Sequence, residues 1–184
     1  MQNCFISAVV TKTGIGTVDL NGFIYNVVEV DIAKLQGFKV FIPVFADVDV
    51  GTIFTSTTWA VTRYKQGDSE TLALRIDNLD IVDEYTPIEY LTAKVTGMFV
   101  NSDKCKLKYV GPTRRAFYRC TLKLKDEFKE SFSILLCGFK DNALKLSTLT
   151  RMTIIQAEVC IRNKRYEDGY ELCINHFQEL VKES

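Results

Sequence analysis

Hydrophobic and polar residues alternate regularly between residues 114 and 125. One set of alternate positions holds Arg115, Phe117, Arg119, Thr121, Lys123 and Lys125, and the other holds Ala116, Tyr118, Cys120, Leu122 and Leu124. Successive side chains of a β-strand point to opposite faces of the sheet. The pattern therefore predicts a strand whose inner face is apolar and whose outer face carries cations and an aromatic ring.

The rest of the chain shows similar strand signals. Alternation, or short apolar runs bounded by turn residues, predict strands at 3–13, 22–32, 38–46, 53–66 and 70–82, and again at 90–100, 114–125, 130–140, 153–165 and 170–177. A short helix is predicted over 141–150, with Asp141 or Asn142 as its cap. Gly14 and Gly16 are expected to end the first strand, and Pro43 to place the third strand at a sheet edge or a bulge.

The segment 83–87 is polar, ends in Pro87 and separates two halves of opposite charge. Residues 1–84 contain 6 Lys and Arg against 11 Asp and Glu, and residues 85–184 contain the remaining 17 of the 23 Lys and Arg against the remaining 12 of the 23 Asp and Glu. We therefore predict an acidic domain at 1–84 and a basic domain at 85–184. Chance is the alternative explanation for a charge difference of this size.

The composition argues against most enzyme classes. Hydrophobic residues make up 47% of the chain, which is enough for a folded core. None of the six cysteines has Cys-x-x-Cys spacing, and His176 is the one histidine, so no metal, cofactor or hydrolase triad is expected. A Gly-rich phosphate loop is also missing. The first residues lack a signal-peptide pattern, and no apolar run is long enough to span a membrane.

Five short strands with a helical turn between the third and the fourth are the outline of an oligonucleotide/oligosaccharide-binding (OB) barrel. The two halves share this order, and residues 6–11 resemble residues 91–96. The predicted fold is therefore all-β: two tandem five-stranded OB-fold barrels, with a short helix in the second. One continuous mixed sheet is the alternative. The strand at 114–125 would be the second strand of its barrel, on the exposed face that binds ligands in OB folds.

Three segments resemble the bacterial single-stranded-DNA-binding protein family. Residues 91–97 look like its first strand with a glycine, 136–146 like its third strand and helix, and 161–170 like its last hairpin. Tandem barrels also resemble replication protein A, or a phage or mobile-element variant. Arg151 and Met152 stand where the family has a glycine, and the chain ends without the family's acidic tail. Recruitment of replication partners through such a tail is therefore not expected.

The resemblance implies a protein that binds single-stranded nucleic acid without catalysis. DNA is the expected ligand and RNA the alternative, in replication, recombination or repair, in the cytoplasm or with DNA in a nucleoid or nucleus. Cations follow the backbone in such proteins, and rings stack on bases. The expected stacking residues are Phe117 and Tyr109, with Phe139 as a weaker candidate. The expected phosphate contacts are Lys104, Lys106, Lys108, Arg115, Arg119, Lys123 and Lys125, and the expected hairpin wall is Arg162, Lys164, Arg165 and Tyr166. Tyr118 is expected in the core, and Trp59 and Tyr64 in the core or at an interface.

The first barrel is expected to contact protein instead. Its second strand should point Phe23, Tyr25, Val27, Glu29 and Asp31 outward. Acids on this face repel phosphate, and the apolar residues suit a second copy of the chain or a replication partner. The alternative function is a tandem OB-fold assembly subunit whose basic face docks an acidic protein.

Overall fold

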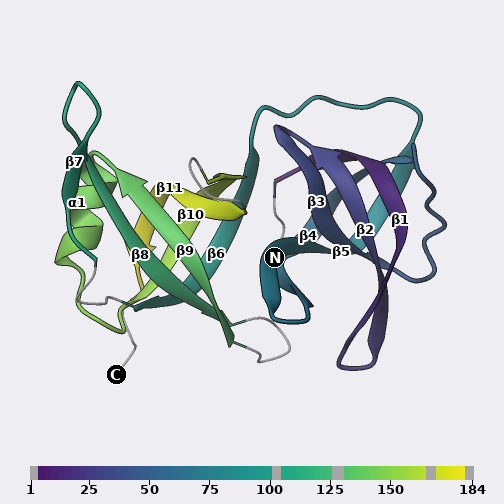
Figure 1. The fold of residues 1–184 in the computed structure, drawn as a ribbon, viewed down its shortest axis with the longest axis horizontal. Coiled ribbons are helices and arrows are strands. Elements are labelled where there is room, and N and C mark those ends of the chain that lie inside the picture. Colours follow the sequence, from purple (N-terminus) through teal and green to yellow (C-terminus); the bar gives the residue numbers. More distant parts are fainter. Residues whose placement is uncertain (1–3, 101–104, 126–130, 165–168, 181–184) are drawn as a thin grey trace. The chain divides into compact units, whose positions relative to one another are not determined.

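The computed structural model describes residues 4–100, 105–125, 131–164 and 169–180, which form strands joined by turns, with a single helix among them (Figure 1). The chain forms two compact units, one made mainly of residues up to Ala93 and the other of residues from Lys94 onward. Residues 83–90 connect the two sheets. Within the first unit, the backbone N–H of Thr86 donates to Oγ of the buried Ser7 at 3.1 Å.

The first sheet is a closed barrel with the strand order β1-β2-β3-β5-β4. Its strands are β1 (Ile6–Leu20), β2 (Phe23–Ile32), β3 (Leu35–Pro43), β4 (Ile53–Gln66) and β5 (Ser69–Val82). Neighbouring strands of this barrel are antiparallel except for β3 and β5, which run parallel. Trp59 and Tyr64 belong to the core, with exposed fractions of 2% and 9%. The ring N–H of Trp59 donates to the carbonyl oxygen of Cys4 at 2.8 Å.

The first strand is longer than predicted, because its glycines bend it without ending it. Gly14 and Gly16 have φ angles of 68° and 151°, and the register with β2 shifts between Val10 and Lys12 and again between Lys12 and Gly16. Glycine tolerates such positive φ values, so the strand passes through an irregular stretch and then continues to Leu20. The prediction that these glycines terminate the strand is wrong.

The prediction that the outer face of β2 is a free surface is also wrong. Tyr25 and Val27 are only 7% and 1% exposed, and they belong to a small apolar cluster that also contains Phe41, Tyr64 and Ala73. The continuation of β1 covers them: Ile15, Val18 and Leu20 pack against the cluster. Glu29 is half-buried and forms an ion pair with Lys39, while Asp31 accepts a hydrogen bond from the Gly37 N–H at 3.0 Å. The chain itself thus occupies most of the expected contact face.

Pro43 does not mark an edge strand, because β3 lies between β2 and β5. It is the last residue of β3 and lies opposite Tyr25 of β2. A proline at the end of a strand removes a backbone donor only where the ladder stops.

The second sheet repeats the connectivity of the first. Its elements are β6 (Leu91–Val100), β7 (Lys108–Val110), β8 (Arg115–Lys125), β9 (Ser131–Phe139), α1 (Asp141–Thr148), β10 (Ile154–Asn163) and β11 (Tyr170–Glu179). The strand order is β6-β10-β11-β9-β8-β7, and an additional pairing of β6 with β8 closes a ring. The short β7 extends the sheet beside the first residues of β8. The chain is therefore all-β with two tandem five-stranded OB-fold barrels, as predicted.

The helix α1 begins without the predicted cap. Lys140 precedes it with a φ of 51°, and no side chain caps the first turn. Asn142 instead donates from Nδ2 to the carbonyl oxygen of Asn175 in β11 at 3.0 Å, so its side chain anchors the helix to the sheet. Ala143 and Leu146 are fully buried. In the described part of the chain, no helix is long and apolar enough to cross a membrane.

Gly97 lies where β6 pairs with β8 and closes the second ring. A Cβ atom at this position would lie 2.8 Å from Cγ of Leu122 and 2.8 Å from the carbonyl oxygen of Lys123. We predict that Gly97→Ala lowers the free energy of unfolding by about 1–3 kcal/mol, because β8 must move to admit the methyl group. Urea denaturation measures the change.

The matched control for this substitution is Thr96→Ala, an exposed position on the same strand. It should change the free energy of unfolding by no more than about 0.5 kcal/mol. Equal unfolding midpoints for Gly97→Ala and the unsubstituted protein would show that β6 and β8 do not approach this closely.

Candidate nucleic-acid interface

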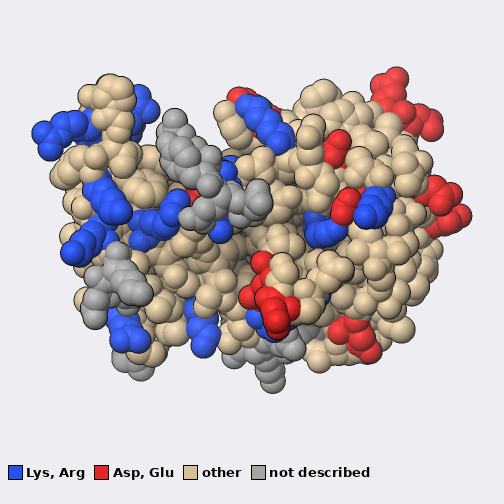
Figure 2. Space-filling view, viewed as in Figure 1, with Lys and Arg blue, Asp and Glu red and all other residues tan. Residues whose placement is uncertain are grey.

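The outer face of β8 is the centre of the candidate interface. Arg115, Arg119 and Lys123 are exposed, and Phe117 is half-buried between the two arginines. The alternate positions Ala116, Tyr118, Cys120, Leu122 and Leu124 are all buried. The predicted alternation of this strand is therefore confirmed, including the core position of Tyr118. In Figure 2, Lys and Arg side chains gather over the unit that contains β8, and acidic side chains are prominent on the unit that contains β1–β5.

Two phenylalanine rings lie together on this face. Phe117 of β8 is directly opposite Phe139 of β9, and their ring centroids are 5.1 Å apart with an angle of 47° between the planes. Both rings are half-buried. Cζ of Arg119 lies 5.7 Å from the Phe117 centroid, and Cζ of Arg162 lies 5.1 Å from the Phe139 centroid. Each ring thus has a guanidinium within the range of a cation–π contact.

A buried carboxylate holds the two guanidinium groups. Glu171 of β11 is 2% exposed, and its Oε1 accepts hydrogen bonds from Nη2 and Nε of Arg162 at 2.8 and 3.1 Å. Its Oε2 accepts from Nη2 of Arg119 at 3.4 Å. Buried carboxylates are costly unless they are paired, and here both oxygens are engaged. The three groups together keep one net positive charge on the face.

Sequence reasoning missed Glu171. An acidic residue directly after the expected hairpin turn reads as an ordinary exposed residue. The available signal was its position in β11 next to the buried Leu172, which places it on the outer face. Its partners, Arg119 on β8 and Arg162 on β10, could be identified only from the order of the strands in the sheet.

Two thiols lie beside these arginines. Cys137 of β9 and Cys173 of β11 are directly paired across the parallel strands, and Nη2 of Arg162 donates to Sγ of Cys137 at 3.3 Å. The hydrogen bond between the two thiols and the charge of Arg162 lower the pKa of Cys173 to about 7. The same hydrogen bond and burial raise the pKa of Cys137. Cys173 is therefore the more acidic thiol of the pair.

Of the two β7 residues Lys108 and Tyr109, only Lys108 points to the same face of the sheet as Phe117. Lys108 of β7 lies opposite Phe117, so its side chain shares the face of that ring. Tyr109 is 57% exposed, but it lies opposite Ala116 and therefore points to the other face of the β7–β8 ribbon. The structure does not bring Tyr109 and Phe117 together as a stacking pair. Lys106 is exposed in the segment that leads into β7.

The remaining expected residues are placed only in part. Arg162 ends up at the centre of the face, and Lys164, which follows β10, is half-buried. Lys104, Arg165, Tyr166 and the side chain of Lys125 lie outside the described residues. Among the residues that the structure describes, no group of three or more His, Cys, Asp and Glu side chains could hold a metal ion.

The fold and this face define a class of protein: two tandem OB-fold barrels, one of which exposes rings and cations on its second and third strands. Over 100% of its length, the chain matches the crystal structure of the single-stranded DNA binding protein from Thermus aquaticus, covering 96% of that chain with a TM-score of 0.66 and 11% identity. A deletion mutant of that protein matches equally well, with 97% of its chain covered, a TM-score of 0.66 and 12% identity. No protein-family model and no curated protein matches the sequence. At this identity the similarity is one of fold.

The thiol pair gives a testable property of the face. A pKa of about 7 for Cys173, against an ordinary value of 9.0, means that the thiolate already predominates at pH 8. We predict that alkylation of Cys173 by iodoacetamide, followed by peptide mass spectrometry, reaches half its maximal rate near pH 7. Arg162→Gln should move this midpoint upward, since the variant lacks the nearby positive charge. Equal midpoints in the two proteins would show that Arg162 does not lower the pKa of Cys173.

Proposed function

We propose that the chain binds single-stranded DNA on the outer face of β8, β9 and β11, without catalysis. The observation that carries this proposal is the pair of rings Phe117 and Phe139, each accompanied by an arginine on one exposed face. Single-strand binding needs these two elements, because bases stack on rings while cations follow the phosphates. The Thermus aquaticus protein of the same fold is itself named for binding single-stranded DNA, which supports the proposal.

The spacing of the cations suits an extended strand. Arg115, Arg119 and Lys123 recur every four residues, so their Cα atoms are about 13 Å apart along β8. Phe117 lies between the first two, with Phe139 beside it on β9. A backbone that follows β8 can contact successive cations while an unpaired base reaches the rings. Duplex DNA keeps its bases stacked inside and offers none for this contact.

Glu171 gives the arginines a fixed geometry. Free arginine side chains lose considerable rotamer entropy when they bind a phosphate. The hydrogen bonds from Arg119 and Arg162 to Glu171 restrict both side chains before the ligand arrives. This preorganisation reduces the entropic cost of binding. The side chains of Arg119 and Arg162 are 43% and 39% exposed, so the guanidinium edges that do not face Glu171 are available to phosphate.

We further propose DNA replication, recombination or repair as the setting of this activity. Each of these processes produces unpaired strands that a non-catalytic binding protein can cover. Such a protein would be found in the cytoplasm, or with DNA in a nucleoid or nucleus.

The stacking role of Phe117 is tested by Phe117→Ala. Loss of a stacking ring should weaken binding of a fluorescein-labelled oligo-dT by about 5- to 150-fold, equivalent to about 1–3 kcal/mol. Fluorescence anisotropy of the full chain measures the affinity. The matched control is Phe23→Ala, which removes a 64% exposed ring from the first barrel and should leave the affinity unchanged. Equal losses in both variants would refute a specific role for Phe117.

The phosphate contacts are tested by salt dependence. Each phosphate neutralised on a single strand contributes about −0.7 to the slope of log K against log salt concentration. Arg115→Ala and Lys123→Ala should each reduce the slope by about this amount. Lys94→Ala, at an exposed position on β6, should not change it.

A competition separates this function from an assembly role. A duplex of equal length should bind more weakly than oligo-dT at two salt concentrations, and poly-glutamate should displace oligo-dT poorly. If poly-glutamate competes as well as oligo-dT does, the basic face docks acidic partners and the nucleic-acid proposal fails.

A further inference from the structure

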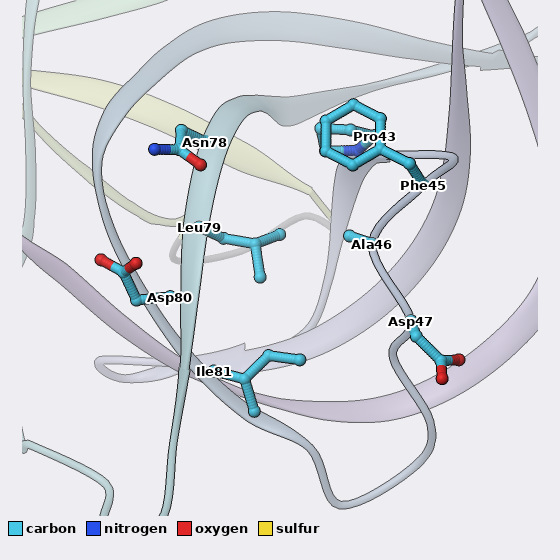
Figure 3. A pocket seen from close by; sticks show the side chains of 8 residues that line it. All are labelled: Pro43, Phe45, Ala46, Asp47, Asn78, Leu79, Asp80 and Ile81. Atoms are coloured by element: carbon cyan, nitrogen blue, oxygen red, sulfur yellow. The ribbon is translucent and has the colours of Figure 1, made fainter.

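The first barrel contains a pocket of about 420 Å³ at one end of β3 and β5. Its lining residues fall within 43–47 and 78–81. One wall is therefore the end of β3 with the loop that follows it, and the other wall is the last part of β5 (Figure 3). This pocket is separate from the proposed binding face, which lies in the second barrel.

The pocket exists because two parallel strands diverge. The residues of β3 from Lys39 to Phe41 pair with β5 from Ala73 to Arg75. Beyond this point β3 ends at Pro43, and the N–H of Ala46 turns back to the Pro43 carbonyl at 2.9 Å. The strand β5 continues along β4, as in the pairing of Ile81 with Phe54. The space between the two strand ends is left open.

A helix fills the equivalent space in the second barrel. There β9 and β11 are the equivalent parallel pair, and β9 ends at Phe139, just before α1. Leu146 of α1 is fully buried, and a Cβ added to Gly138 of β9 would lie 2.8 Å from its Cδ1. Asn142 binds the carbonyl of Asn175 beyond the parallel pairing. In the first barrel, the connection from Val44 to Thr52 contains turns and no helix.

The surroundings of the pocket are apolar and acidic. Phe45 is 84% exposed and Ile81 is 57% exposed, so both apolar side chains are accessible to a partner. Asp47 and Asp80 are exposed on the two opposite walls (Figure 3). The sequence has no Lys or Arg between residues 40 and 62 or between residues 76 and 93. A partner for this pocket would thus offer apolar side chains flanked by positive charge.

We propose that this pocket docks a short amphipathic helix of a partner protein. A large apolar side chain of the helix packs against Phe45 and Ile81. Separate Lys or Arg side chains of the helix approach Asp47 on one wall and Asp80 on the other. The partner helix then supplies to the first barrel what α1 supplies to the second within its own chain. The proposal concerns a different surface from the nucleic-acid face, so either can fail without the other.

The test is a titration of the full, ¹⁵N-labelled chain with a synthetic stapled helix that carries Leu and Lys on one face. Backbone amide shifts should appear at residues 44–47 and 78–81. Phe45→Ala and Asp47→Lys should each weaken binding by about tenfold or more, as loss of a central interface contact does. Leu144→Ala, which removes an exposed apolar side chain from α1 in the second barrel, should bind the peptide normally.

Two control peptides complete the test. Replacement of each Lys by Glu should abolish the shifts, because the pocket rim is acidic. A peptide of the same composition that is held extended should bind more weakly than the helix. The proposal is overturned if millimolar helical peptide shifts no pocket amide, if Phe45→Ala binds as well as the unsubstituted protein, or if the extended peptide binds better. Oligo-dT affinity of Phe45→Ala should remain unchanged throughout.

Discussion

Closure of a small ring of strands is the constraint from which the rest of this structure follows. The second ring closes where β6 pairs with β8, and Gly97 allows the two backbones to approach because a side chain there would collide with Leu122. The interior of such a ring has room only for packed apolar side chains. The described cations of β8, Arg115, Arg119 and Lys123, therefore lie outside. The candidate binding face is thus a direct consequence of the packing inside the barrel.

The buried Glu171 is the polar centre of that face. A carboxylate that is 2% exposed requires partners, and it has them in Arg119 and Arg162, which come from β8 and from the end of β10. These two strands lie on either side of the β9–β11 pair. The ion-pair network therefore links four neighbouring strands and fixes the guanidinium groups against Phe117 and Phe139. The side chains that join these strands are thus the ones that we propose for ligand binding.

The two barrels show how one topology acquires different surfaces. Both have the same strand order and the same parallel pair. In the first, the continuation of β1 covers Tyr25 and Val27, and the diverging strand ends leave an acidic pocket. In the second, α1 covers the diverging ends, while the outer face of β8 carries exposed cations. Differences in connections, rather than in the sheets, assign distinct chemistry to each unit.

The amino-acid sequence alone predicts those strands in which hydrophobic and polar residues alternate regularly. Alternation gave the inner and outer faces of β8, the core position of Tyr118 and the repeated order of strands, because these depend on neighbours in the chain. Tertiary structure decided the rest. The helix cap at Asp141 or Asn142 was replaced by the anchor from Asn142 to Asn175, and the expected outer face of β2 was covered by residues of β1.

The candidate site divides in the same way. Arg115, Phe117, Arg119 and Lys123 share a face because a strand repeats every two residues. The partnership of Glu171 with two arginines, the pairing of Cys137 with Cys173 and the opposite orientation of Tyr109 depend on which strands are neighbours and in what register. Local periodicity encodes the face of a side chain, whereas its partners are set by contacts between segments far apart in the sequence.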